Sequence, residues 1–185
     1  SPPLMEPHGH QGHLWTHLKA VTFANSTFIA VGYSGTILTS SDGTSWTSRT
    51  SGTSSGLIGI SYGGSTFVTV GCCSGGSGTI LTSSDGTSWT SRTSGTSSGL
   101  EAVTYANSTF IAVGGAGTIL TSSDGTSWTS RTSGTSSSLK AVTYANSTFI
   151  AVGDSGTILT SSDGTSWTSR TSGTSRILEA VTYSE

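Results

Sequence analysis

Short apolar runs separated by glycine and polar turns recur along most of the chain. In one stretch, residues 100–106 predict a first strand, 109–113 a second, 118–122 a third and 127–132 a fourth. The second run is apolar throughout, which is typical of a strand covered on both faces by neighbouring sheets. The fourth run places Trp128, Ser130 and Thr132 on one face and Thr129 and Arg131 on the other, as an outer, half-solvated strand does. The pattern therefore predicts a four-stranded unit with buried inner strands and a polar outer edge.

The same unit occurs four times. Each copy contains the segment Ser-Ser-Asp-Gly-Thr-Ser-Trp, which places equivalent tryptophans at Trp46, Trp89, Trp128 and Trp167. A period near 40 residues with four short strands is typical of β-propeller blades. We therefore expect an all-β fold, a β-propeller-type repeat of four four-stranded blades with a period of 39 residues, plus one extra C-terminal strand.

The repeat divides the chain into three parts. Residues 1–17 form an N-terminal extension that bears histidines. The four repeats are expected at residues 18–56, 57–99, 100–138 and 139–177. Residues 178–185 reproduce the first strand of a fifth unit, and we expect this strand to be unpaired within the chain and exchanged between subunits. Two alternatives are that the segment around Leu14–Thr16 completes a blade, and that the chain is a piece of a longer array.

An Asp-Gly pair follows the third strand of every repeat. A carboxylate before glycine accepts hydrogen bonds from turn amides, while glycine takes the positive φ that the turn needs. The tryptophan of each copy is then expected to pack back over the hairpin. The structural turn residues are accordingly Asp42, Asp85, Asp124 and Asp163, together with the four tryptophans.

The Ser-Ser-Asp-Gly-Thr-Ser-Trp element resembles the Asp box of sialidases, sortilin-type receptors and the photosystem II assembly factor family. The repeat Leu-Glu-Ala-Val-Thr-Tyr-Ala-Asn-Ser-Thr-Phe-Ile-Ala-Val of residues 100–113 is most similar to that last group and its bacterial relatives. The resemblance covers roughly residues 18–185 and implies a propeller fold. It implies no single function, because such propellers serve as enzymes, receptors and scaffolds.

The composition excludes some classes of partner. Charged residues make up 9% of the chain and the net charge is −2, so no basic surface for nucleic acid is indicated. No apolar stretch approaches the roughly 20 residues that a membrane helix needs. The chain begins with Ser1, which fits either a mature secreted protein or a fragment. We take the secreted, extracellular interpretation.

The sequence Asn-Ser-Thr occurs between the first and second strands of three repeats. It is an acceptor pattern for N-linked glycan, and the candidate sites are Asn25, Asn107 and Asn146. The alternative is that asparagine simply favours this turn.

No catalytic residue is predicted. The four arginines, Arg49, Arg92, Arg131 and Arg170, share one place in the repeat, so the symmetry spreads them around the rim and keeps them apart. The aspartates are turn formers, and no acid–base pair is identifiable. We therefore expect a protein that is not an enzyme and has no cofactor.

Histidines and cysteines lie where the copies differ. His8, His10 and His13 are weak candidates for copper or zinc ligands, against the simpler interpretation of a tail with incidental histidines, so no metal site is predicted. Cys72 and Cys73 are adjacent in the one enlarged loop, and they form a vicinal disulfide or remain thiols.

The loop between the second and third strands varies from copy to copy, with Tyr33 in the first unit and Asp154 in the fourth. The repeats differ most in this loop and are nearly identical elsewhere. This difference favours the propeller face that holds these loops as the binding surface. The functional hypothesis is a non-enzymatic extracellular structural protein that self-assembles into a ring or filament through residues 178–183. The alternative is a lectin-like propeller module that binds carbohydrate or protein.

Overall fold

The computed structural model of the chain describes residues 17–72 and 77–183. They form four antiparallel sheets of four strands each, and each sheet is called a blade below. The first blade contains β1 (Leu18–Ala24), β2 (Thr27–Gly32), β3 (Ile37–Ser40) and β4 (Thr47–Arg49). The second contains β5 (Gly56–Gly63), β6 (Thr66–Cys72), β7 (Gly78–Ser83) and β8 (Thr90–Arg92).

The third and fourth blades repeat this arrangement. The third contains β9 (Leu100–Ala106), β10 (Thr109–Gly114), β11 (Ile119–Ser122) and β12 (Thr129–Arg131). The fourth contains β13 (Leu139–Ala145), β14 (Thr148–Gly153), β15 (Ile158–Ser161) and β16 (Thr168–Arg170). Short 3-10 turns, η1 (Tyr33–Gly35), η2 (Gly115–Gly117) and η3 (Asp154–Gly156), connect the second and third strands of blades one, three and four.

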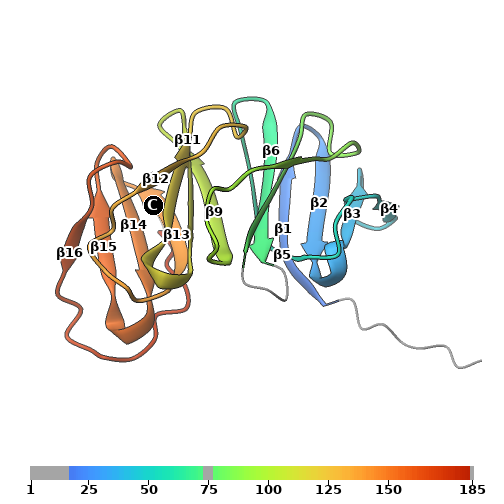
Figure 1. The fold of residues 1–185 in the computed structure, drawn as a ribbon. Coiled ribbons are helices and arrows are strands. Elements are labelled where there is room, and N and C mark those ends of the chain that lie inside the picture. The colour runs from blue at the N-terminus through green and yellow to red at the C-terminus, as the bar shows by residue number, and fades with distance from the viewer. Residues whose placement is uncertain (1–16, 73–76, 184–185) are drawn as a thin grey trace, which may run out of the picture.

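The blades follow one another in chain order and form an open arch (Figure 1). The innermost strands β1, β5, β9 and β13 lie next to one another from blade to blade. Within every blade the strands are ordered as they occur in the sequence. The predicted all-β propeller-type repeat is confirmed.

The outer strands are shorter than the sequence pattern predicts. In the third blade we expected strands at 118–122 and 127–132, whereas β11 covers Ile119–Ser122 and β12 covers Thr129–Arg131. β12 begins at Thr129 because the backbone N–H groups of Thr126 and Ser127 donate to the Asp124 carboxylate instead of to a neighbouring strand. β11 begins at Ile119 because the Thr118 N–H donates to the Gly115 carbonyl within the preceding turn.

The hydrophobic core consists of three clusters, one at each junction between consecutive blades. At the junction of blades three and four, one blade contributes Ile111, Val113 and Ile119. The next blade contributes the opposite half, which is Leu139, Phe149, Ala151 and Leu159, with Val142, Tyr144 and Trp167 packed against it. A blade is therefore stabilised mainly by its neighbours, since each face that meets another blade supplies half of a core.

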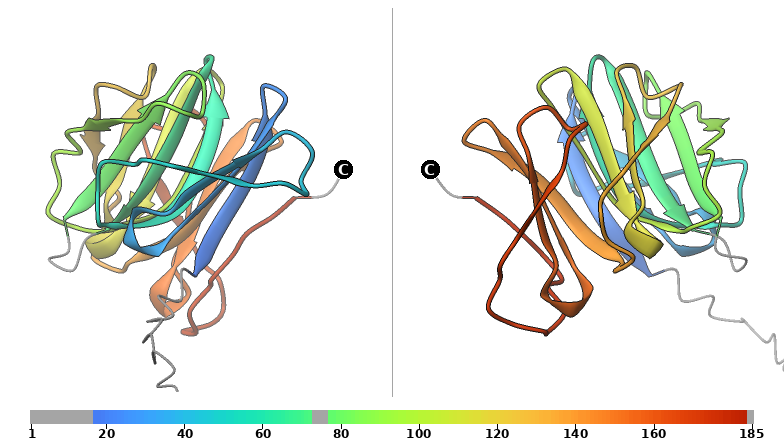
Figure 2. Two further views of the ribbon diagram at one scale, coloured as in Figure 1. Left: turned by 90° about the vertical axis from the view of Figure 1, so that its right-hand side faces the viewer. Right: turned by 60° about the vertical axis from the view of Figure 1, so that its left-hand side comes forward.

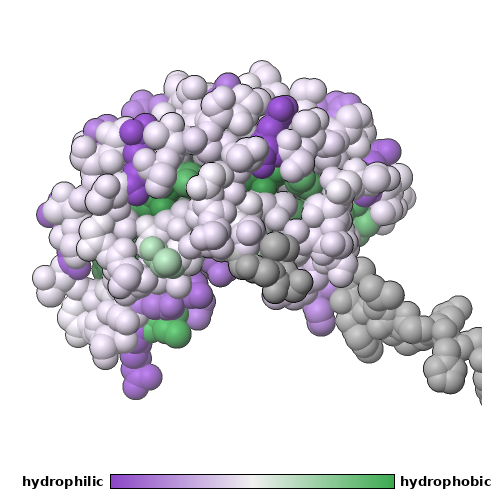
Figure 3. Space-filling view, in the orientation of Figure 1, coloured by the Kyte–Doolittle hydropathy of each residue, from purple (hydrophilic) through white to green (hydrophobic). Residues whose placement is uncertain are grey.

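The surface in Figure 3 is mostly of intermediate hydropathy, because serine, threonine and glycine cover the turns and outer strands. Strongly apolar side chains show there only in small areas. No helix among the described residues is long and apolar enough to span a bilayer.

Residues 178–183 pair with no strand in the part of the chain that the structure describes. Leu178 nevertheless starts in the place of a next inner strand, since its backbone N–H donates to the Gly153 carbonyl at 3.0 Å. Figure 2 shows this segment, in dark red, leaving the fourth blade as a single extended chain. Leu178 and Val181 are half-buried, whereas Tyr183 is 57% exposed.

Candidate functional site

The loop face of each blade is built from the turn after the second strand and the linker that leads to the next blade. In the first blade the Gly35 N–H donates to the Ser55 carbonyl at 2.7 Å, which ties turn and linker together. Gly35 has a φ of +68°, and a Cβ there would meet the Thr53 carbonyl oxygen at 2.0 Å. Only glycine fits this position, so the close approach of the two loops depends on it.

Tyr33 and Asp154, which the sequence favours as binding residues, occupy equivalent positions on this loop face. Each lies beside a lysine of its own inner strand: the Lys19 Nζ is 4.4 Å from the centre of the Tyr33 ring, and the Lys140 Nζ is 4.0 Å from the Asp154 Oδ1. That Asp154 oxygen is buried and accepts no hydrogen bond among the described residues. The two ends of the arch thus present different polar pairs on the same scaffold.

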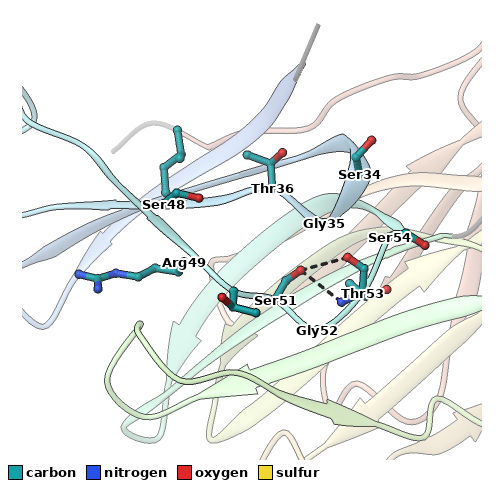
Figure 4. A pocket seen from close by; sticks show the side chains of 11 residues that line it. Ser34, Gly35, Thr36, Ser48, Arg49, Ser51, Gly52, Thr53 and Ser54 are labelled. Atoms are coloured by element: carbon teal, nitrogen blue, oxygen red, sulfur yellow. Dashed lines mark hydrogen bonds between the residues drawn. The ribbon is translucent and has the colours of Figure 1, made fainter. Parts of the chain in front are cut away.

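A shallow polar pocket lies beside the loop face in three of the blades. In the first it has a volume of about 730 Å³, and η1, Leu38 of β3, β4 and the following linker line it (Figure 4). The Ser51 hydroxyl shapes the wall, because it donates to the Thr53 carbonyl at 3.2 Å and accepts from the Thr53 N–H at 3.3 Å. The equivalent pockets of the third and fourth blades measure about 470 and 520 Å³.

One arginine lines each of these pockets, but its side chain is turned along the sheet. The Arg49 Nε donates to the Thr39 hydroxyl at 2.8 Å, and Figure 4 shows the guanidinium pointing away from Ser51 and Thr53. Arg92, Arg131 and Arg170 make the same bond to the equivalent threonine. The arginines stay on separate blades, and no carboxylate or histidine lines the three pockets.

The Asp-Gly turns share most of their hydrogen bonds in all four blades. In the first, the Asp42 Oδ1 accepts from the Ser40 hydroxyl and from the N–H groups of Thr44 and Ser45 at 2.8–3.0 Å. The backbone bond from Ser45 is the main reason that the pKa of Asp42 lies well below its ordinary value. The Trp46 Nε1–H donates to the Gly43 carbonyl at 3.2 Å, which folds the indole over the turn.

The pKa values of the other three turn aspartates, Asp85, Asp124 and Asp163, are lowered in the same way. The backbone bond from Ser88 is the main cause for Asp85. The Thr126 hydroxyl is the main cause for Asp124, and the backbone bond from Ser166 for Asp163. These carboxylates are committed acceptors, so the geometry gives them a structural role and no proton to exchange near neutral pH.

The Asn-Ser turns expose their asparagines. Asn25 and Ser26 both have positive φ, at 47° and 57°, which is the two-residue hairpin turn that asparagine tolerates well. Asn107 and Asn146 sit in the same turn and are likewise exposed. The three acceptor patterns are therefore sterically open, and their glycosylation stays a prediction.

The remaining candidates lie largely outside the described residues. His8, His10, His13 and Cys73 are among the residues whose structure is not described, and Cys72 is half-buried at the end of β6. The vicinal disulfide and the metal ligands thus remain predictions. Among residues 17–72 and 77–183, no three His, Cys, Asp or Glu side chains come together as a metal site would require.

The outward face of the first blade is a candidate site that the sequence analysis missed. Val21 and Phe23 on β1 are 61% and 58% exposed, and Trp46 is 39% exposed. A groove of about 400 Å³ runs between Val21 and Trp46, over Leu18 and Ala30. The equivalent positions are buried or half-buried in the other blades, where a preceding blade covers them.

Comparisons with known proteins show the fold. No family model and no curated protein matches the chain. The chain is similar to a solved structure described as YCF48 bound to D1 peptide, with 20% identity over 89% of this chain and 56% of that chain, and a TM-score of 0.67. It is similar to the computationally designed Ika8 protein, with 16% identity over 91% of this chain and 53% of the other and a TM-score of 0.72.

A third similar structure is the WD40 beta propeller domain of Doa1, with 15% identity over 81% of this chain and 53% of that one, and a TM-score of 0.60. The chain thus spans just over half the length of these proteins. Four blades in an open arch correspond to part of a propeller.

Proposed function

We propose that this chain is a non-enzymatic structural propeller protein that self-associates. The observation that carries the proposal is the exposed apolar face of the first blade. Val103 and Val142 are equivalent to Val21 and lie at blade junctions. Val103 is 8% exposed, and Val142 is half-buried. The same surface packs against a neighbouring blade in the other three copies and is exposed in the first. An exposed apolar surface of this kind marks an interaction site.

The partner that fits this face best is another copy. Every junction inside the chain joins the same two kinds of surface, so a second copy already carries the complementary one. Residues 178–183 are the proposed donor, since they repeat the inner-strand sequence and pair with no strand among the described residues. Donating a strand would satisfy their backbone N–H and C=O groups.

We expect the assembly to work outside the cell and to carry glycan. The open turns at Asn25, Asn107 and Asn146 support this part of the proposal. Treatment of the native protein with an N-glycosidase should lower its mass and convert modified asparagines to aspartates. An unchanged mass would remove the glycan from the proposal and leave self-association untouched.

The central test is the mass in solution as a function of protein concentration, measured by sedimentation equilibrium. The wild-type chain should gain mass with concentration. Leu38 is equivalent to Leu159, which packs in the junction of the third and fourth blades. Leu38→Glu places a carboxylate on the exposed face of the first blade and should keep the chain monomeric, and so should deletion of residues 177–185. Thr129→Glu, on the exposed outer strand β12, is the matched control and should associate like the wild type. A wild-type chain that stays monomeric throughout would refute the proposal.

A second candidate function rests on the loop face. The Lys19–Tyr33 and Lys140–Asp154 pairs give this face varied chemistry on a constant scaffold. YCF48, a similar fold, is described as bound to a peptide. A protein- or carbohydrate-binding role predicts saturable binding on a peptide or glycan array that Tyr33→Ala or Asp154→Ala abolishes. Thr129→Gln, on the exposed outer strand β12 and outside the three pockets, should leave the binding intact.

A further inference from the structure

The fourth blade presents half of a hydrophobic core on its outward face. Ile150, Val152 and Ile158 are equivalent to Ile111, Val113 and Ile119, which supply one half of the junction between the third and fourth blades. Ile150 and Ile158 are only half-buried, although their counterparts in the third blade are fully buried. No blade follows among the described residues to complete this half.

The first blade presents the other half. Phe28, Ala30, Leu38 and Trp46 are equivalent to the residues with which the fourth blade completes its junction, namely Phe149, Ala151, Leu159 and Trp167. The Phe28 and Trp46 rings already lie together, with centroids 6.3 Å apart. The chain therefore carries two complementary half-cores at opposite ends of an arch, where they cannot meet within one copy.

We propose that two copies join head to tail at both ends and close a ring of eight blades. In each junction, residues 178–183 of one copy pair with β2 of the other, in place of that copy's own β1. The inference rests on the proposed self-association and specifies its partner surface, its strand register and its stoichiometry.

The side chains of the donated segment fit the junction. Leu178, Val181 and Tyr183 are equivalent to Leu139, Val142 and Tyr144, which pack in the existing junction. Tyrosine occupies the last of these positions in all three internal junctions, where its ring lies about 4.5 Å from that of a phenylalanine, as for Tyr62 and Phe67. β1 has Phe23 there instead.

Charge also favours exchange over simple docking of the two ends. In the assembled ring, the inner strand next to β13 is either the donated segment or the β1 of the other copy. Both have a charged residue at the position equivalent to Lys140. With the donated segment this neighbour is Glu179, whereas an undisplaced β1 would supply Lys19. Opposite charges at corresponding positions of adjacent strands set the register, and like charges oppose it. Exchange also keeps the hydrogen bond from Leu178 to Gly153.

The size of the arch indicates two copies. The four blades superpose on 53% of the WD40 beta propeller domain of Doa1, so one arch is about half of a closed propeller. Two arches then use both pairs of half-cores, and only the two displaced β1 strands stay outside the junctions. A filament would leave the half-core of a first blade exposed at one end and the half-core of a fourth blade exposed at the other.

Cysteine pairs placed at the observed register test the exchange. Val21 lies opposite Ala30 in the β1–β2 pair, so Val181 takes that place in the exchanged form. All variants carry Cys72→Ser and Cys73→Ser. The pair Ala30→Cys and Val181→Cys should oxidise to a covalent dimer with two disulfides. The pair Val21→Cys and Ala30→Cys should form an intrachain disulfide that locks β1 on β2, keeps the chain monomeric when oxidised and releases dimerisation when reduced.

The matched control is Val142→Cys with Ala151→Cys, an equivalent pair inside the fourth blade, which should form an intrachain disulfide without affecting assembly. If the wild type associates but the locked chain associates equally well, exchange is overturned and the proposed self-association stands. If Ala30→Cys/Val181→Cys yields a ladder of higher masses, the two-copy ring is overturned. A wild type that remains monomeric would instead remove the proposed function itself.

Discussion

The first and third blades have nearly the same sequence but opposite surroundings. In the third blade Val103 and Phe110 are at most 8% exposed, and the second blade packs against them. In the first blade the equivalent Val21 is 61% exposed and Phe28 is half-buried. The two blades therefore show which features form within one blade and which need a neighbouring blade. Strand pairing and register within the blade are the same in both, while the burial of the apolar face comes only from the neighbour.

The largest expected effect is on the core phenylalanines. Phe110→Ala should destabilise the fold by about 3–5 kcal/mol, because it empties a fully buried site. Phe28→Ala should cost about 1 kcal/mol, because its ring is already partly in water. Denaturant unfolding at a protein concentration that keeps the chain monomeric measures both. Equal losses would mean that the first blade is covered in solution.

The glycines of the Asp-Gly turns give a second comparison. Gly125 and Gly43 both have positive φ, +77° and +75°, so alanine should strain either backbone by about 1–2 kcal/mol. A Cβ at Gly125 would also lie 2.9 Å from the Val68 Cγ2 of the preceding blade, whereas at Gly43 it would meet only the Phe28 ring, at 3.6 Å. Gly125→Ala should therefore cost about 1 kcal/mol more than Gly43→Ala in thermal unfolding. A difference of zero would show that the junction relaxes around the added methyl.

Acid should affect both blades alike. The folded chain holds the pKa of Asp42 and Asp124 below the ordinary value of 3.8, so their stabilisation is fully present above about pH 4. It is lost as the pH falls from there toward the lower pKa of the folded state, because the unfolded chain binds more protons. The melting temperature should hold between pH 7 and 5 and fall below pH 4. Asp42→Asn and Asp124→Asn should each reduce this acid dependence equally.

An unequal reduction would contradict the view that the turn is a local structure. Its hydrogen bonds come from within four residues in both blades, so the neighbouring blade has no part in them.

The smallest effect is expected for the Lys140–Asp154 pair. The two groups are 4.0 Å apart and partly exposed, with 26% and 33% of their side chains accessible. Lys140→Met should change the free energy of unfolding by less than about 0.5 kcal/mol, because solvent and salt screen such pairs. Equilibrium unfolding at low and high salt checks this value. A larger loss at low salt alone would show that the buried Asp154 oxygen depends on this lysine.

The sequence was sufficient for the fold because each strand signal occurs four times. The apolar run of β10, the polar turns and the tryptophan spacing predicted four-stranded blades, and these were found. The start of the outermost strand was predicted less well, because backbone N–H groups of Thr126 and Ser127 donate to the Asp124 carboxylate and not to a neighbouring strand. The exposed face of the first blade was not predicted, although all its residues had been assigned to strands or turns.

What the sequence determined by itself is local: strands, turns, and the Asp-Gly hairpins whose hydrogen bonds span only a few residues. What the tertiary structure decided is which copies of the same residue are buried. Trp46 and Trp128 occupy the same position in the repeat, and only Trp128 has a preceding blade to pack against. Burial depends on the position of a blade in the arch, and near-identical repeats carry no record of that position.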